Sequence, residues 1–288
     1  MTPIMERTEK SRLPWAQIAW FGLLAVVCYA PILRALVAQW IDDPDMGHGF
    51  FVPLIAGYIV WQRRAELAAI KPRPNPWGLV VVIWGGIQLL IGSLGVELFT
   101  SRTAIVITLI GVVWTLGGTE ILRKTAFPLF LLFFMVPIPA VVYNTLTLKL
   151  QLLASRLAAA GLMGIGIPVM REGNILDLPT QRLSVVEACS GIRSLVSLTF
   201  LSLVYGYFLE KRTWIRVVLF LATVPIAILA NAGRVMTTGI LSQIRPDLAE
   251  GFFHESTGLV VFFVAAAILF IVHKALLIGS RLVARRVA

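Results

Sequence analysis

Three residues in the second half of the chain carry side chains that could together break a peptide bond. The first is Cys189, whose thiol lies in the segment 187–194, EACSGIRS, directly before an apolar run that begins a predicted helix. A helix N-terminus favours the thiolate form of a nearby cysteine, and its free N–H groups can stabilise an oxyanion. Cys189 is therefore a candidate nucleophile, although a cysteine that only packs at a helix end explains the position equally well.

The second and third candidates are Arg234 and His254. Arg234 ends a predicted span and lies three residues after Asn231, so the two share one helical face. A guanidinium is always charged and can hold a carboxyl group, a carbonyl or an oxyanion. His254 can take a proton from a thiol and return it to a leaving amine near neutral pH. The alternatives are an arginine that only reaches the membrane interface and a hydrogen-bonded structural histidine.

Other polar residues could bind a substrate or support these three. Arg193 lies four residues after Cys189 on the same helical face, so it competes with Arg234 as the group that binds the oxyanion. The remaining supporting candidates are His48, Glu187, Ser190, Asn231 and Arg245.

The sequence predicts no metal and no cofactor. It contains no HExxH or comparable ligand spacing, and its two cysteines cannot build a disulfide framework. Cys28 lies within an apolar run, where we expect it to pack. His273 lies near the far end of the last apolar run, where we expect a structural role.

The elements that must position these residues are membrane helices. Hydrophobic residues make up 58% of the 288 positions and charged residues 14%, against about 25% charged in soluble domains. We therefore expect an all-α polytopic membrane protein with about eight transmembrane helices. The segment 50–62 is short, and 126–147 is interrupted by prolines, so neither need cross fully. The predicted spans are 15–39, 50–62, 77–95, 103–120, 126–147, 191–209, 214–233 and 255–279.

One long polar insertion, residues 148–190, lies between the fifth and sixth spans. Apolar residues at helical spacing over 149–162 predict a short amphipathic helix at the membrane interface. Turn signals at 172–174 and 178–180, between short β-branched runs, predict a β-hairpin that leads to Cys189. Since no repeat or appended soluble domain is evident, we expect a single domain over 1–288, with terminal tails at 1–14 and 280–288.

The charge distribution predicts the orientation in the membrane. With a cytoplasmic N-terminus, 16 of the 25 basic residues but only five of the 15 acidic residues fall on the cytoplasmic side. This asymmetry follows the positive-inside rule, so it explains the formal charge of +10 without a nucleic-acid partner. Both termini are then cytoplasmic, and Cys189, Arg234 and His254 share the extracytoplasmic face.

Four short segments surround the candidate residues. They are GHGFFVP (47–53) followed by WQRR (61–64), EACSGIRS (187–194), NAGR (231–234) and HESTG (254–258). These segments resemble the signature motifs of the exosortases, in the exosortase/archaeosortase group, occur in the family's order and cover about residues 40 to 275. The pattern departs at Met46 and Gly47, because a serine often precedes the His-Gly-Phe in the family. The resemblance is to the stand-alone form, and we expect no fused periplasmic domain of the kind that some exosortases carry.

The resemblance implies a membrane cysteine endopeptidase or transpeptidase of a bacterial inner membrane. Its partners would be exported proteins whose C-terminal sorting signal has a Pro-Glu-Pro motif, a transmembrane helix and a basic tail. Membrane lipid, an unknown acceptor nucleophile and a separate periplasmic accessory protein are further implied partners. By motif, Cys189 would be the nucleophile, His254 the general base and acid, and Arg234 the third member. Archaeal relatives carry arginine in place of His254, so the histidine points to the bacterial branch.

Three other functions are compatible with parts of this pattern. A membrane acyltransferase would use the same cysteine with a lipid donor, so a lipid thioester would distinguish it. A transporter or flippase should place polar groups deep in several spans, whereas most strongly polar residues here lie at span ends. A structural assembly factor would function without the cysteine.

Overall fold

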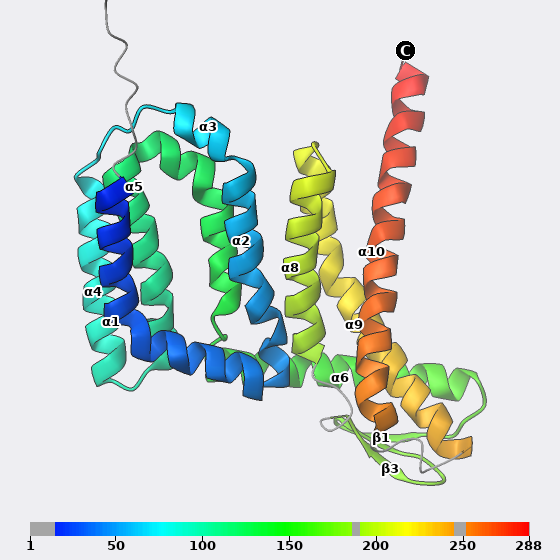
Figure 1. Cartoon of the computed structure of the whole chain (residues 1–288). Coiled ribbons are helices and arrows are strands. Elements are labelled where there is room, and N and C mark those ends of the chain that lie inside the picture. Colours follow the sequence, from blue (N-terminus) through cyan, green and yellow to red (C-terminus); the bar gives the residue numbers. More distant parts are fainter. Residues whose placement is uncertain (1–14, 186–190, 245–251, 288) are drawn as a thin grey trace, which may run out of the picture. The chain divides into compact units, whose positions relative to one another are not determined.

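The structure is a computed structural model that describes residues 15–185, 191–244 and 252–287. The chain divides into two compact units, Met1–Pro139 and Ala140–Ala288. Both are helical, and the second also contains a small antiparallel sheet (Figure 1). Among the described residues, six helices are long and apolar enough to cross a membrane. The predicted fold class, an all-α polytopic membrane protein with a small β element, is confirmed.

The first unit follows the predicted spans closely. The helix expected at 50–62 is indeed short, at 12 residues, and a 3-10 helix precedes it. The first helix contains Pro31, and its ribbon bends part-way along (Figure 1). Cys28, expected to pack within this helix, has an exposed side chain. The elements are α1 (Trp15–Asp42), η1 (Pro44–Phe50), α2 (Phe51–Gln62), α3 (Arg64–Ala69), α4 (Trp77–Leu94), α5 (Leu98–Leu131) and η2 (Leu132–Met135).

Small residues allow α4 to pack closely on α5. Gly78, Gly85 and Gly92 are seven residues apart and buried on one face of α4. Close backbone approach at small residues is how helices associate where lipid removes the hydrophobic driving force. A methyl group on these glycines would collide with α5 at three positions that are also seven apart, Thr115, Thr108 and Ser101.

A break at Gly118 makes α5 a helical hairpin. Gly118 has a φ of 82° and a ψ of −178°, and a Cβ there would collide with the carbonyl oxygen of Arg73, so only glycine fits. The ribbon rises, turns over and returns beside α2 (Figure 1). The first half accounts for the span predicted at 103–120, and the second half contains only the beginning of the span predicted at 126–147.

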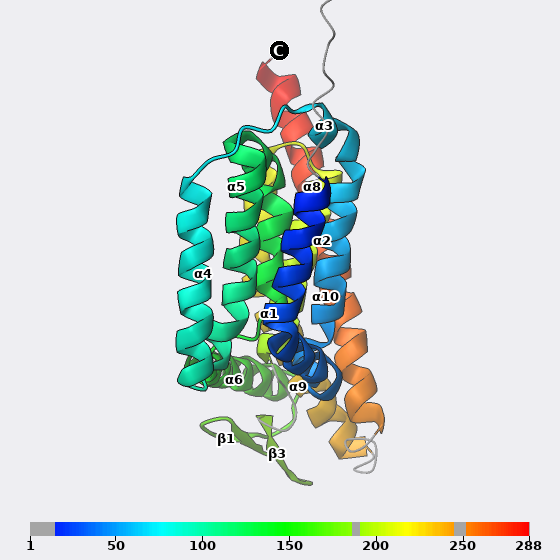
Figure 2. The same cartoon turned by 60° about the vertical axis from the view of Figure 1, so that its left-hand side comes forward.

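The second unit is a helical bundle with the sheet at one end. Consecutive helices run in opposite directions, so the start of α8, the end of α9 and the start of α10 lie at the same end (Figures 1 and 2). Helix α6 crosses this end and packs against α9, with the sheet beside it. The elements are α6 (Ala140–Gly164), β1 (Met170–Glu172), β2 (Ile175–Asp177), β3 (Arg182–Ser184), α8 (Gly191–Leu209), α9 (Thr213–Ile244) and α10 (Phe252–Val287).

The predicted hairpin is present and is extended by a third strand. The strands pair in the order β1-β2-β3, with Glu172 opposite Ile175 and Leu176 opposite Leu183. Gly173 begins the first turn with a φ of 64°, which a two-residue turn of type II′ requires at its first central position. The strand order makes β3 an edge of the sheet.

Helix α6 begins earlier than predicted. The expected end of the fifth span at residue 147 is wrong, because Pro137 and Pro139 interrupt the helical run and α6 starts at Ala140. The amphipathic helix predicted over 149–162 is therefore the second part of a 25-residue helix. Its buried face has the expected helical spacing and consists of Gln151, Ala154, Ser155, Ala158, Ala159 and Leu162.

Candidate active site

The nucleophile candidate lies between two described elements of the second unit. Strand β3 ends five residues before Cys189, and α8 begins at Gly191, two residues after it. The helix that was expected to follow the cysteine is therefore present. Cys189 itself lies outside the described residues, as do three of the supporting candidates, Glu187, Ser190 and Arg245.

One buried cluster joins the strand that leads to Cys189 with the helix that carries Arg234. Leu183 of β3 and the following Val185 belong to it, together with Val235 of α9 and Leu162 of α6. Val185 and Val235 are fully buried. Because Val235 directly follows Arg234, this packing fixes the arginine's helical turn relative to the end of β3.

The Arg234 guanidinium reaches the beginning of α10. A methyl group on Gly258 would lie 3.3 Å from Nη1 and 3.5 Å from Nη2 of Arg234. Gly258 is one helical turn after His254, whose backbone lies in the first turn of α10. The structure thus brings together the motif segments 231–234 and 254–258. The side chain of His254 lies outside the described part.

Asn231 and Arg193 differ in their surroundings. Asn231, on the same face of α9 as Arg234, is buried with 5% of its surface exposed. Arg234 is half-buried, whereas Arg193, in the first turn of α8, is exposed. A half-buried guanidinium interacts more strongly with an oxyanion than an exposed one, because less water screens the charge. This difference favours Arg234 over Arg193, and the assignment stays a prediction.

His48 of the first unit binds the end of η2, the 3-10 helix that follows α5. Its Nε2 lies 3.1 Å from the carbonyl oxygen of Phe134, and the indole N–H of Trp40 donates to the carbonyl of Met135 at 3.0 Å. Burial lowers the pKa of His48, so the neutral ring with its proton on Nε2 fits this contact. His48 and Trp40 thereby cap two carbonyls that Pro137 and Pro139 leave without helical donors. The sequence analysis selected His48 as a supporting candidate but did not select Trp40.

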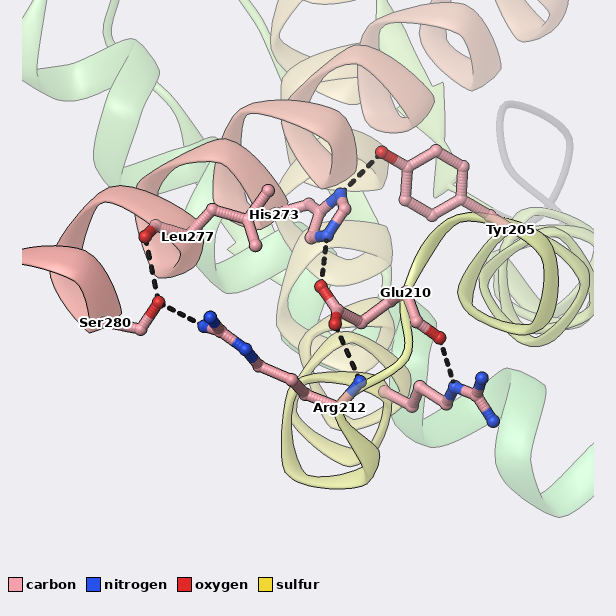
Figure 3. A network of polar contacts seen from close by, with 7 residues as sticks. Tyr205, Glu210, Arg212, His273, Leu277 and Ser280 are labelled. Carbon is pink, nitrogen blue, oxygen red and sulfur yellow. Dashed lines mark hydrogen bonds and ion pairs between the residues drawn. The ribbon is translucent and has the colours of Figure 1, made fainter. Parts of the chain in front are cut away.

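His273 belongs to a buried polar network at the opposite end of the second unit. Its Nε2 lies 3.0 Å from the Glu210 carboxylate and its Nδ1 lies 2.7 Å from the Tyr205 hydroxyl (Figure 3). The second Glu210 oxygen accepts from the backbone N–H of Arg212 at 2.7 Å. The contacts fit the structural role predicted for His273. Sequence analysis missed Glu210, although it is the one carboxylate between residues 191 and 244.

Within the described ranges, no group of three or more His, Cys, Asp or Glu side chains could hold a metal ion. In this part of the chain the half-buried Arg234 lies close to Gly258, and both are near strand β3 and the starts of α8 and α10. Such an arrangement can bind an extended peptide and stabilise negative charge on it.

Comparison with known families decides the assignment. Residues 40–271 match the family described as transmembrane exosortase, of the EpsH type. The chain belongs to the transmembrane exosortase family. No curated protein and no solved structure gives a significant match.

Membership of the exosortase family confirms the resemblance that the four motifs indicated. It implies a multi-pass membrane protein with a protease or transpeptidase activity in the processing of sorting signals. It also implies PEP-CTERM proteins as substrates. The match spans His48, Cys189, Arg234 and His254.

Proposed function

We propose that this exosortase cleaves PEP-CTERM sorting signals at the extracytoplasmic membrane face through a thioester on Cys189. The observation that supports this most directly is that the elements next to three of the four motif segments meet at one end of the second unit. Strand β3, which precedes Cys189, shares a buried cluster with Val235, and the neighbouring Arg234 reaches the first turns of α10, near His254.

In the proposed reaction His254 removes the proton from the Cys189 thiol, and the sulfur attacks the scissile carbonyl carbon. Negative charge develops on the carbonyl oxygen, where Arg234 and N–H groups at the start of α8 stabilise it. The C–N bond then breaks as His254 gives its proton to the leaving amine. The products are a thioester on Cys189 and a released C-terminal helix. Attack of water on the thioester hydrolyses it, whereas attack of an acceptor nucleophile transfers the cleaved substrate to that acceptor.

The orientation proposed for the protein is the one that the basic residues predict, with both termini in the cytoplasm. The start of α8, the end of α9 and the start of α10 then lie at the extracytoplasmic face of a bacterial inner membrane. A substrate that emerges from the membrane there presents its juxtamembrane peptide to these three helix ends.

The test is processing of a tagged protein with a Pro-Glu-Pro motif, a helix and a basic tail, co-expressed with the enzyme. We expect Cys189→Ala and His254→Ala to abolish processing and Arg234→Lys to reduce it. Cys28→Ser is the matched control, because Cys28 is the other cysteine and is exposed on α1. Normal processing by Cys189→Ala would overturn the proposal. A hydroxylamine-sensitive adduct that contains lipid rather than peptide would point to an acyltransferase.

A further inference from the structure

The outer edge of β3 has the geometry of a peptide-binding strand. β3 is the last strand in the order β1-β2-β3, and within the described ranges no strand pairs with its outer side. An edge strand presents unpaired N–H and C=O groups that can template an added strand. This edge is the candidate because the chain continues from it to Cys189.

The hydrogen-bond pattern shows which groups face outward. On the β2 side, the carbonyl of Gln181 accepts one backbone bond and the N–H of Val185 donates another, both at 3.0 Å. Backbone groups alternate in direction along a strand, so the N–H and C=O of Leu183, which lies midway between Gln181 and Val185, also point toward β2. The two residues whose backbone groups face away are therefore Arg182 and Ser184. No other described residue hydrogen-bonds the carbonyl of Arg182 or the N–H of Ser184.

The direction of the chain fits a parallel partner. From β3 the chain runs past Cys189 into α8, which is long and apolar enough to span the membrane. A PEP-CTERM signal runs in the same order, from the motif into a transmembrane helix. If both helices enter the membrane in the same direction, the motif lies parallel to β3. Ser184 is five residues from Cys189, a separation that spans at most about 18 Å.

A Pro-Glu-Pro segment is suited to an edge on which only two residues, Arg182 and Ser184, turn their backbone groups outward. Proline has no N–H, and the backbone groups of successive residues in an extended chain point to alternate sides. When the N–H and C=O of the glutamate point toward the sheet, the nitrogens of both prolines therefore point away from it. Only the glutamate then needs backbone partners on the sheet. In a parallel pair of strands, each bonded residue faces one residue of the neighbouring strand, and its N–H and C=O bond to the two residues on either side of that opposite residue. With the glutamate opposite Leu183, its N–H donates to the carbonyl of Arg182 and its carbonyl accepts from the N–H of Ser184.

We propose that β3 binds the sorting signal as a fourth, parallel strand, with the motif glutamate held between the Arg182 carbonyl and the Ser184 N–H. The inference rests on the proposed function, because it needs the signal to be processed at this end of the second unit. It assigns substrate recognition to the backbone of β3 and leaves the Arg182 side chain outside the contact. That side chain is engaged within the sheet, 2.9 Å from Asp177 and 3.3 Å from Glu172.

The first test is Ser184→Pro. Its missing N–H faces outward, so the sheet keeps its internal hydrogen bonds, and proline is tolerated at such edge positions. We expect about tenfold slower processing, as for the loss of one hydrogen bond to the substrate, with an unchanged thermal transition in detergent. Ser184→Ala is the matched control, because it keeps the N–H, and Arg182→Gln tests the side chain. Both should process within about twofold of the wild type. Normal processing by a folded Ser184→Pro enzyme would overturn the proposal.

A second test does not depend on cleavage. In enzyme with Cys28→Ser and Cys189→Ser, we introduce Ser184→Cys and pair it with a substrate whose second motif proline is replaced by cysteine. In the proposed register these two residues are opposite each other, so oxidation should cross-link them. Arg171→Cys, on the far strand β1, should cross-link at most about one tenth as much, because two strands separate it from the substrate. Equal cross-linking at both positions contradicts strand addition whether or not Cys189 is the nucleophile.

Discussion

The imidazole Nε2 of His273 lies 3.0 Å from the Glu210 carboxylate, and the two residues have only 4% and 6% of their surface exposed. With a neutral ring, Nε2–H donates to Glu210 and Nδ1 accepts from the Tyr205 hydroxyl (Figure 3). The hydrogen bond from His273 lowers the pKa of Glu210. This network joins the end of α8 to the middle part of α10, at the end of the second unit away from Cys189's neighbouring elements.

Glu210→Ala should therefore destabilise the second unit without removing the proposed chemistry. It leaves the His273 ring N–H and the Arg212 backbone N–H without their acceptor, at an expected cost of about 3 kcal/mol in unfolding free energy. Thermal unfolding in detergent measures the effect. Glu66→Ala is the control, because its ion pair with Lys124 is exposed and should contribute little. Equal losses for both variants would contradict the buried network.

Gly258→Ala should impair processing through Arg234. The added methyl group would lie 3.3 Å from Nη1, so the guanidinium must shift by a few tenths of an ångström. We expect about tenfold slower processing of the tagged substrate with little change in stability, because positioning errors of this size affect transition-state contacts. Gly279→Ala is the control, since a methyl group there meets nothing within 4 Å and the residue lies outside the motif segments. If the two variants process alike, Arg234 does not act from its observed position.

Local patterns in the sequence were sufficient to predict the helices and the β element. Apolar runs predicted α4, α8 and most of α9, and turn residues around Gly173 predicted the first hairpin. The third strand was missed although the turn signal at 178–180 lies shortly before it, because all three strands have only three residues and none gives a periodic signal. The end of the fifth span was misplaced because α6 continues the apolar run beyond Pro139.

The candidate site was only partly predictable, since its motif residues are far apart in sequence. Motif resemblance selected Arg234 and His254 but could not reveal that the Arg234 guanidinium lies close to Gly258, which depends on how α9 packs on α10. The Glu210–His273 pair, 63 residues apart, was also invisible, because no local spacing links the two. Such pairs are set by tertiary packing, which periodicity does not encode.

His48 should make the first unit less stable as the pH falls. Burial lowers its pKa below the ordinary 6.5, so the unfolded chain binds a proton more readily than the folded one. The linked stability is complete above about pH 6.5 and decreases below it, by at most about 1.4 kcal/mol per pH unit. Unfolding midpoints from pH 8 to 5 should therefore fall more steeply for the wild type than for His48→Gln, which does not titrate. Parallel profiles would show that His48 titrates normally.

The packing of α4 on α5 gives a test with neighbouring residues on the two faces of one helix. A methyl group at Gly85 would collide with Thr108, whereas one at Gly86 meets nothing within 4 Å. Gly85→Leu should force the two helices apart and cost about 3 kcal/mol or more, because an overpacked interface cannot relax without moving backbone. Gly86→Leu should be neutral or slightly stabilising, since leucine has the better helix propensity and its side chain has open space. Unfolding by SDS titration compares the two variants at equal composition. If Gly86→Leu were the more damaging, α4 would present its other face to α5.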